Sequence, residues 1–252
     1  KYGIYVVPTL DVFPQNNYFF AKCNTVQDIE FPNLQYMSQD CVNAKAQYVK
    51  LFLDGLKDRV GVKILSTIAW ISITNEAFYS TDFKPFSSMS MNVTTSSNNK
   101  TYDMSNPISR QMCANENSLN YVNTITSYVG KEYENVLITI GVFTYFAVGK
   151  TVNKNYGILP LVNKMKHNRT DNRFPFLPTV LLSGESKLDL LDVHVYHTPG
   201  WVMSEDLESV EWKSIDFTRN CVVMGEFGAF RTNPSVFPTP RDAAISMKNQ
   251  QI

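Results

Sequence analysis

The sequence has no long hydrophobic run. Its longest apolar candidate, Val136 to Val148, is interrupted by Thr139, Gly141 and Thr144. A membrane-spanning helix needs about 20 consecutive apolar residues. The sequence therefore predicts no membrane span.

The sequence also lacks an excess of either charge. It holds 23 basic and 23 acidic residues, so its formal net charge is zero. Binding to nucleic acid or to an anionic membrane relies on a basic surface, and we expect neither partner. The sequence contains no Cys-x-x-Cys pair and no Cys/His cluster with the spacing of metal ligands. We therefore expect neither a metal site nor a cofactor.

An initiator methionine and a signal sequence are absent as well, because the chain starts Lys1-Tyr2-Gly3 and continues at once into a strand-like segment. We expect a processed or cut chain. Asn-x-Ser/Thr sequons, which mark glycosylation sites, occur at Asn92, Asn99 and Asn168. The four cysteines permit two disulfides in three pairings, and the sequence does not choose between them: Cys23, Cys41, Cys113 and Cys221. Sequons beside cysteines favour a secreted protein.

What the sequence does contain is enough apolar material for one large core. It has 252 residues, of which 44% are hydrophobic and 13% aromatic. A length near 250 is typical of a single (β/α)8 barrel, known as a TIM barrel. We expect one domain over residues 1–252, with a polar loop insertion at about 80–106 that is rich in Ser, Asn and Thr.

Apolar runs and helical periodicity alternate along the chain. Five buried strands are expected, at 1–10, 62–74, 135–143, 188–196 and 220–227. Helices are expected at 40–57, at about 119–129, and from Pro240, which follows a capping threonine. Strands that alternate with helices predict a parallel sheet. A closed barrel needs eight strands, so the expected fold is a TIM (β/α)8 barrel that is incomplete in this chain.

Two glutamates stand out, because each ends one of these apolar runs. Glu76 ends AWISITNEAF, and Glu226 follows CVVMG. A carboxylate at the carboxyl end of a buried strand suits an active site on the rim of a parallel barrel. Two such carboxylates indicate acid/base and nucleophilic work on a sugar bond.

Three short motifs follow in order, each at a strand end: Asn75-Glu76, His194-Val195-Tyr196 and Gly225-Glu226-Phe227-Gly228. Together they resemble the clan A glycoside hydrolases, in particular the cellulase and endo-β-mannanase family numbered five. The resemblance runs from about Gly3 to Phe230 and is thin in the loops. It implies that the first two barrel strands and the last one are absent from this chain, together with the family's Arg near the nucleophile and a Trp platform.

The resemblance also implies roles for single residues. Glu76 corresponds to the general acid/base and Glu226 to the nucleophile. The expected substrate-binding residues are Asn75 at the sugar 2-hydroxyl, His194 beside the acid/base or the sugar, Tyr196 against the nucleophile, and Trp201 as a sugar platform. Asp11 and Asn16 stand where the family often presents polar contacts, but the family's usual His is absent there, and we assign neither.

The implied function is retaining, endo-acting hydrolysis of a β-1,4-linked mannan or glucan, with a polysaccharide or oligosaccharide as the partner. Physics supports the roles: repulsion between two close carboxylates raises one pKa, and a tyrosine hydroxyl keeps the other carboxylate ionised. Simpler alternatives stay open. Each glutamate alone would suit a structural ion pair, and His194 a core position. The whole chain would also suit an inactive, glycan-binding or structural component of an extracellular assembly.

Overall fold

A computed structural model describes residues 3–11, 21–23, 26–148, 150–153, 157–160, 171–196, 218 and 220–228. Its centre is a row of parallel strands that follow one another in chain order. The extended segment 3–11 bridges to Ile68 and Ser72, and β1 (Ile71–Ser72) pairs with β5 (Ile138–Thr139). β6 (Gly141–Phe143) continues β5 and pairs with β10 (Leu191–Tyr196), which pairs with β11 (Val222–Gly228). All these pairings are parallel, as the sequence predicts.

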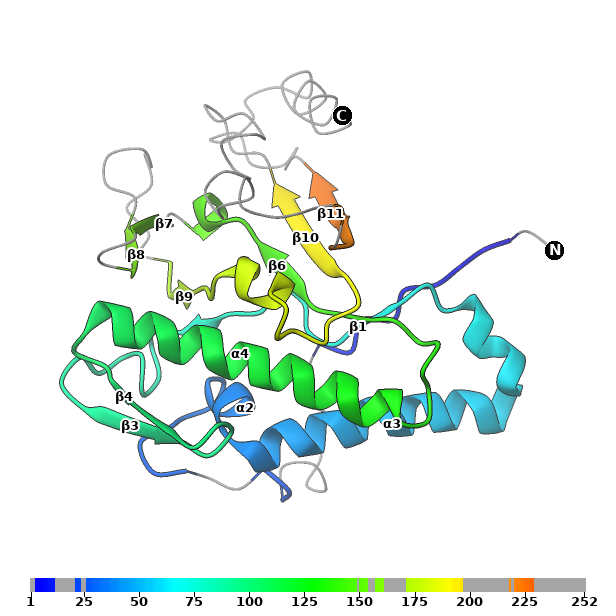
Figure 1. Cartoon of the computed structure of the whole chain (residues 1–252), viewed down its shortest axis with the longest axis horizontal. Coiled ribbons are helices and arrows are strands. Elements are labelled where there is room, and N and C mark those ends of the chain that lie inside the picture. The colour runs from blue at the N-terminus through cyan, green and yellow to red at the C-terminus, as the bar shows by residue number, and fades with distance from the viewer. Residues whose placement is uncertain are drawn as a thin grey trace.

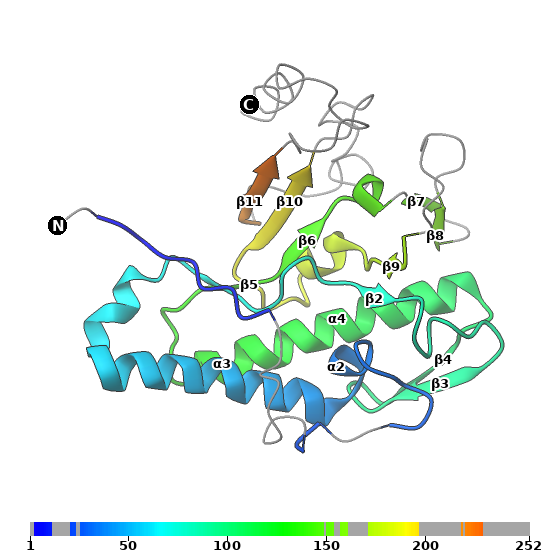
Figure 2. The same cartoon turned by 180° about the vertical axis from the view of Figure 1, so that it is seen from behind.

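Two long helices pack side by side along this row (Figures 1 and 2). α3 (Gln39–Val60) connects the first extended segment to β1, and α4 (Pro107–Gly130) connects β1 to β5. Both helices were expected, although α4 begins 12 residues, or about three turns, before the range 119–129 that apolar periodicity marked. Its start is set by Asn106, whose side chain accepts hydrogen bonds from the backbone N–H groups of Ile108 and Ser109, and by Pro107 at the first helical position.

The polar insertion is not a bare loop. It holds a hairpin of β3 (Asn92–Thr95) and β4 (Lys100–Asp103), and β2 (Tyr79–Ser80) before it pairs with β9 (Arg173–Phe174). Beneath these strands lies a chain of buried aromatic rings with centroids 4.8–5.0 Å apart: Tyr121, Tyr36, Tyr79, Phe86 and Phe174. Phe86 of the insertion belongs to this chain of rings, and Val93, Tyr102 and Met104 are also buried, so the insertion has an apolar side despite its Ser- and Asn-rich composition.

The remaining elements are short. They are α2 (Leu34–Met37), η1 (Val62–Thr67), η2 (Tyr145–Val148), β7 (Lys150–Asn153), β8 (Gly157–Pro160) and η3 (Pro178–Leu182). η3 stands where a third long crossover helix would be expected between β6 and β10.

Two expected strands differ from the structure. Residues 62–67 of the expected strand 62–74 form the 3₁₀ helix η1, and regular pairing is confined to Ile71–Ser72. Gly61, with φ +96°, ends α3 and turns the chain, and the residues directly after it form η1, which has no buried residue. The expected strand 1–10 makes only two isolated bridges, and Ile4 and Tyr5 are 71% and 67% exposed. Exposure is confined to the first part of the segment, because Leu10 at its end is buried in the core.

The described residues form an open row and no closed barrel. Exposed apolar side chains mark both ends of the row: Ile4, Tyr5, Val6 and Val7 on the first segment, and Met224 and Phe227 on β11. Cys23 and Cys41 form a disulfide, while Cys113 is a buried and Cys221 an exposed free cysteine, so the structure has one of the two disulfides that four cysteines permit. Among the helices described, none is long and apolar enough to cross a membrane.

Candidate active site

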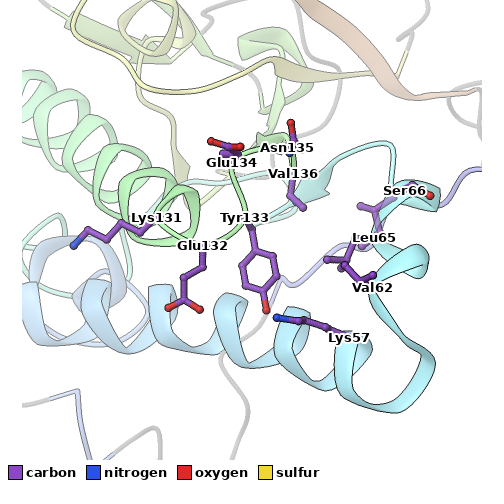
Figure 3. Close-up of a pocket in the computed structure, with 11 residues that line it drawn as sticks. Lys57, Val62, Leu65, Ser66, Lys131, Glu132, Tyr133, Glu134, Asn135 and Val136 are labelled. Carbon is purple, nitrogen blue, oxygen red and sulfur yellow. The ribbon is translucent and has the colours of Figure 1, made fainter.

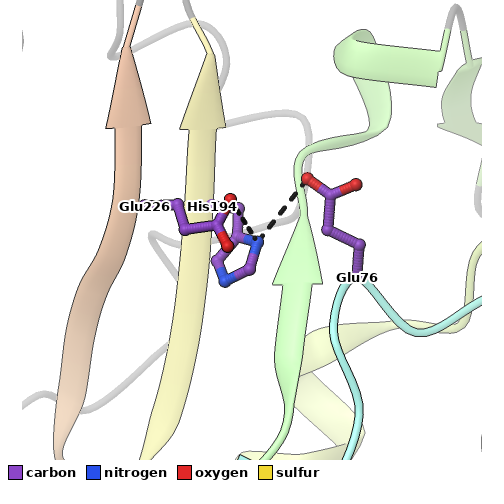
Figure 4. A group of neighbouring side chains, drawn as sticks. All are labelled: Glu76, His194 and Glu226. Carbon is purple, nitrogen blue, oxygen red and sulfur yellow. Dashed lines mark ion pairs between the residues drawn. The ribbon is translucent and has the colours of Figure 1, made fainter. Parts of the chain in front are cut away.

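Three of the predicted site residues meet at the carboxyl ends of the strands. Glu76, His194 and Glu226 each offer one ligand-type atom, and these three atoms lie within 4.8 Å of one another. His194 stands between the two glutamates (Figure 4): its Nδ1 is 3.5 Å from Glu76 Oε1 and 3.4 Å from Glu226 Oε2. The sheet explains the meeting, because His194 pairs in register with Glu226 on one side and with Phe143 on the other.

Glu76 has a strained backbone. Its φ of +45° is left-handed, which is uncommon for a residue other than glycine. Hydrogen bonds fix the chain on both sides of it. The Asn75 N–H donates to Asp11 Oδ1 at 2.8 Å, and the Ala77 N–H donates to the carbonyl of Gly141 at 2.9 Å. These contacts keep a conformation that the residue alone would avoid, and such strain is common at functional sites.

Asp11 therefore has a structural role, whereas the family often has polar substrate contacts at this place in the chain. Its carboxylate holds the Asn75 backbone, and its carbonyl accepts a hydrogen bond from the buried Lys45 Nζ at 3.0 Å. Lys45 Nζ also donates to the carbonyl of Leu10. Asp11 thus ties the end of the first extended segment to the residue before Glu76.

His194 is oriented from behind by Asp192. The imidazole is 2% exposed, and its Nε2 lies 3.7 Å from Asp192 Oδ2. The other oxygen of Asp192 accepts a hydrogen bond from the Gly225 N–H at 2.8 Å. A Cβ at Gly225 would meet the Asp192 carboxylate, and one at Gly141 would approach the imidazole to 3.1 Å. Glycine at both positions leaves the space that the two side chains occupy.

Arg173 contacts the far side of Glu76. Its Nη1 lies 3.5 Å from Glu76 Oε2, and its guanidinium donates three hydrogen bonds of 2.8–3.3 Å to Asp171. The guanidinium also lies over the Phe143 ring, 5.1 Å from the ring centroid. Arg173 reaches the site because β9, which carries it, pairs with β2 directly after Glu76. Sequence reasoning missed Arg173, since no local pattern connects it with Glu76.

The neighbouring carboxylates stabilise the charged form of His194. Burial by itself lowers the pKa of this imidazole, but Asp192, Glu76 and Glu226 outweigh burial and raise the pKa to about 9. His194 is therefore protonated at neutral pH, and it shares its charge between two carboxylates.

The charge on His194 has the opposite effect on Glu76. The close contact with His194 lowers the pKa of Glu76 below its ordinary value, burial opposes the change, and the charges of His194 and Arg173 lower the pKa further. The expectation that repulsion raises one carboxylate pKa does not hold for Glu76, because two cations face it. Glu76 is ionised at neutral pH.

Arg173→Gln is expected to raise the pKa of Glu76, because it removes one of the two cations facing this carboxylate. The check is a pH titration of the Glu76 carboxyl carbon by NMR in both proteins. The matched control is Lys100→Gln, which removes a lysine of the β3–β4 hairpin that is paired with Glu116 of α4. This variant should leave the Glu76 titration unchanged. An unchanged Glu76 titration in Arg173→Gln would show that this arginine does not act on the site.

The other predicted residues are placed only in part. Asn75 is half-buried, and its backbone is bound to Asp11 as described. Tyr196 ends β10, where its backbone pairs with Gly228. Trp201, the sequon Asn168 and the expected helix from Pro240 lie outside the described residues. Asn92 begins β3 and Asn99 lies in the turn after it, and both are exposed, as a glycosylation acceptor must be.

A cavity of about 760 Å³ lies elsewhere, near the amino ends of β1 and β5 (Figure 3). Its lining includes Lys57, Leu65, Glu132, Tyr133 and Val136. Glu132 is paired with Lys50, and the Tyr133 hydroxyl donates to Asp54. These polar groups serve the contact of α3 with the end of α4, and the candidate site at the opposite ends of the strands is a separate feature.

No family model and no curated protein matches the sequence. Solved structures do. The fold is similar to that of the endo-1,4-β-mannanase from Rhizomucor miehei, with a TM-score of 0.50 at 16% identity over 91% of this chain and 56% of that chain. The exo-β-1,4-mannosidase Op5Man5 from Opitutaceae bacterium strain TAV5 gives 0.46 at 11% identity, over 96% of this chain and 35% of that one. The likeness is one of fold, and the chain spans little more than half of the mannanase's length.

Proposed function

We propose that this chain is the catalytic part of a retaining glycoside hydrolase that cleaves inside β-1,4-linked mannan or glucan. The observation that carries the proposal is the spacing of Glu76 and Glu226, which have carboxylate oxygens within 4.8 Å of each other. Retaining enzymes hold their two carboxyl groups about 5–5.5 Å apart, whereas inverting enzymes leave about 6.5–9.5 Å for a water molecule.

In the proposed reaction, Glu226 attacks the anomeric carbon while Glu76 protonates the oxygen of the departing sugar. The bond between the sugars breaks, and a glycosyl ester forms on Glu226. Glu76 then takes a proton from water, which attacks the same carbon and releases the sugar with its original anomeric configuration. The substrate 2-hydroxyl is assigned to Asn75 and one sugar face to Trp201, as the resemblance implies.

The proton that Glu76 donates must reach it first, because Glu76 is ionised in the free chain. His194 is the protonated member of the three, and its Nδ1 faces Glu76 Oε1 at 3.5 Å. We assign to His194 the supply of this proton when a bound sugar displaces water and disfavours the charged carboxylate. Hydrolysis should therefore decline as the pH rises through about 9, where His194 loses its proton.

The barrel that would enclose this site is proposed to be incomplete in the chain. Exposed apolar residues on both outer strands support this, since a closed barrel would pair these edges. Secretion with glycosylation at Asn92 and Asn99 is also proposed, on the exposure of both side chains and the disulfide. Expression in a eukaryotic secretory host should add mass that a glycosidase for N-linked sugars removes, and the double variant Asn92→Gln/Asn99→Gln should lose most of it.

The decisive experiment offers the chain defined oligosaccharides of β-1,4-linked mannose and of β-1,4-linked glucose. Proton NMR during the first minutes identifies the anomer released. The β-anomer is expected to appear first and to equilibrate slowly with the α-anomer. Initial release of the α-anomer would contradict retention, and the preferred sugar would decide between mannan and glucan.

One specific observation favours a second function, glycan binding without hydrolysis. Glu76 is ion-paired with Arg173 and has a lowered pKa, which is the state of a structural carboxylate rather than of a poised acid. In that case the chain binds glycans without cleaving them, as part of an extracellular assembly. Calorimetric binding of mannohexaose or cellohexaose, with no product after prolonged incubation, would favour this second reading.

A further inference from the structure

A buried nitrogen without a hydrogen-bond partner points into the centre of the site. Among the described residues, His194 Nδ1 has no hydrogen-bond partner, although the imidazole is 2% exposed. Its nearest acceptors, Glu76 Oε1 and Glu226 Oε2, lie at 3.5 and 3.4 Å, beyond the usual hydrogen-bond distance of about 2.7–3.2 Å. A buried polar atom left in this way needs an explanation, and a bound ion is one that fits its position between two carboxylates.

The spacing of these atoms suits a small cation. Zinc binds imidazole nitrogen and carboxylate oxygen at about 2.0–2.2 Å, so two ligands on a tetrahedral ion lie about 3.4 Å apart. The two nitrogen–oxygen distances are 3.5 and 3.4 Å. The two carboxylate oxygens lie within 4.8 Å of each other, so they must approach by up to about 1.4 Å to reach the spacing on a tetrahedral ion. Both glutamate side chains are partly exposed, which leaves room for this approach.

The surroundings of the three residues resemble the outer shell of a metal site. A histidine that binds a metal usually directs its other nitrogen to a carboxylate, which fixes the ring. Here Asp192 Oδ2 lies 3.7 Å from His194 Nε2, and Asp192 is itself held by the Gly225 N–H. Arg173 contacts Oε2 of Glu76 and leaves Oε1 facing the imidazole.

We propose that Glu76, His194 and Glu226 bind one divalent transition-metal ion of the zinc type, with a fourth position open to water. The ion takes the place of the proton on His194, which leaves to solvent as the ion binds. Three protein ligands with an open fourth position are typical of accessible zinc sites. The ion would occupy the two carboxylates assigned to hydrolysis, so it would block turnover reversibly. This regulatory consequence rests on the proposed function, whereas metal binding itself does not.

The test is calorimetric titration of the full chain with zinc chloride, in the absence of any sugar. One equivalent is expected to bind. Glu226→Gln and His194→Asn should each weaken zinc binding at least about tenfold. Asp192→Asn, which changes a residue that contacts His194 but not the ion, should weaken it by at most about 100-fold. The matched control is Glu134→Gln, an exposed glutamate lining the distant cavity, which should bind zinc like the parent.

A spectroscopic readout separates loss of the site from loss of the fold. Cobalt(II) bound at low coordination number should give a strong visible absorption band in the parent chain, and His194→Asn should lose it while its far-ultraviolet circular dichroism stays unchanged. Should Glu226→Gln fail to fold, Glu76→Gln provides the same comparison. Absence of zinc binding, or binding that all of these variants leave unchanged, would overturn the proposal.

The outcome is independent of whether the chain hydrolyses glycans. A chain that binds zinc at these residues but cleaves no sugar would support the metal site and contradict the proposed function. A chain that cleaves sugar but binds no zinc would support the proposed function and contradict the metal site. Where both hold, zinc should inhibit hydrolysis and a chelator should restore it.

Discussion

Glu226→Gln is expected to lower kcat on β-1,4-linked oligosaccharides by a factor on the order of 10⁴ or more. Glutamine keeps the size of the side chain but cannot attack the anomeric carbon, so no glycosyl ester forms. Losses of this size are typical when a residue that acts as the nucleophile is removed. The measurement is steady-state hydrolysis with product quantified by chromatography. Activity within tenfold of the parent would contradict the assignment of Glu226.

Glu76→Gln should give a different pattern, which distinguishes the two carboxylates. A substrate with a nitrophenol leaving group needs no acid to depart, so its first step should stay fast in Glu76→Gln and slow in Glu226→Gln. The second step still needs a base, so Glu76→Gln should release a burst of nitrophenol followed by slow turnover. Glu134→Gln serves as the control, because this exposed residue lies at the opposite end of the strands. Identical behaviour of the two variants would mean that the roles are not divided in this way.

His194 is expected to make the folded state more stable at neutral pH than at alkaline pH. Its folded pKa of about 9 lies above the ordinary value of 6.5. A group with a raised folded pKa contributes its full stabilisation below the unfolded pKa and loses it as the pH rises through the folded one. The difference of about 2.5 pKa units corresponds to a free energy of unfolding on the order of 3 kcal/mol. This contribution should be complete below pH 6.5 and absent well above pH 9.

Lys45 works in the opposite direction and would hide the effect in the parent protein alone. Burial lowers the pKa of Lys45 to about 7, although the charge of Asp11 opposes the change. A lysine whose pKa is lower in the folded state than in the unfolded state destabilises the fold at low pH, because the buried amine must be charged or give up its proton. The free energy of unfolding therefore rises as the pH rises from about 7. Between pH 7 and 9 the two residues therefore nearly cancel in the total.

The measurement must be a difference between two proteins. Free energies of unfolding from urea titrations at pH 6 and at pH 9.5 should be compared for the parent and for His194→Asn, since Lys45 contributes equally to both. The parent's advantage over the variant is expected to shrink as the pH rises. An advantage that is independent of pH would show that the imidazole stabilises the fold by packing and not through its charge.

Helical periodicity predicted α3 and the second half of α4, because both present one apolar stripe to the same core, including Val42, Val49, Val122 and Ile125. It missed the first half of α4, from Pro107 to Ser118. Apolar runs predicted the strands less well. The run after Gly61 is apolar without being paired, and a 3₁₀ helix and a strand of two residues share it. A short apolar segment indicates burial but does not by itself indicate which hydrogen bonds the backbone makes.

The candidate site shows the same division. Glu76, His194 and Glu226 were predicted because residues that end parallel strands meet at one edge of a sheet. Asp192 had a readable signal, since it stands two residues before His194 and so on the same face of β10. Arg173 had none. It comes from a segment without clear periodicity and arrives beside Glu76 through the pairing of β9 with β2.

The sequence by itself determined the helices, the order of the parallel strands and the three residues at their ends, because these depend on local periodicity and on where apolar runs stop. Only the tertiary structure decided the distances between Glu76, His194 and Glu226, the contact of Arg173, and the charge carried by each group. Charge states depend on burial and on neighbours within a few ångströms, and those neighbours lie up to 150 residues apart along the chain. The same residues therefore acquire their chemistry from the fold.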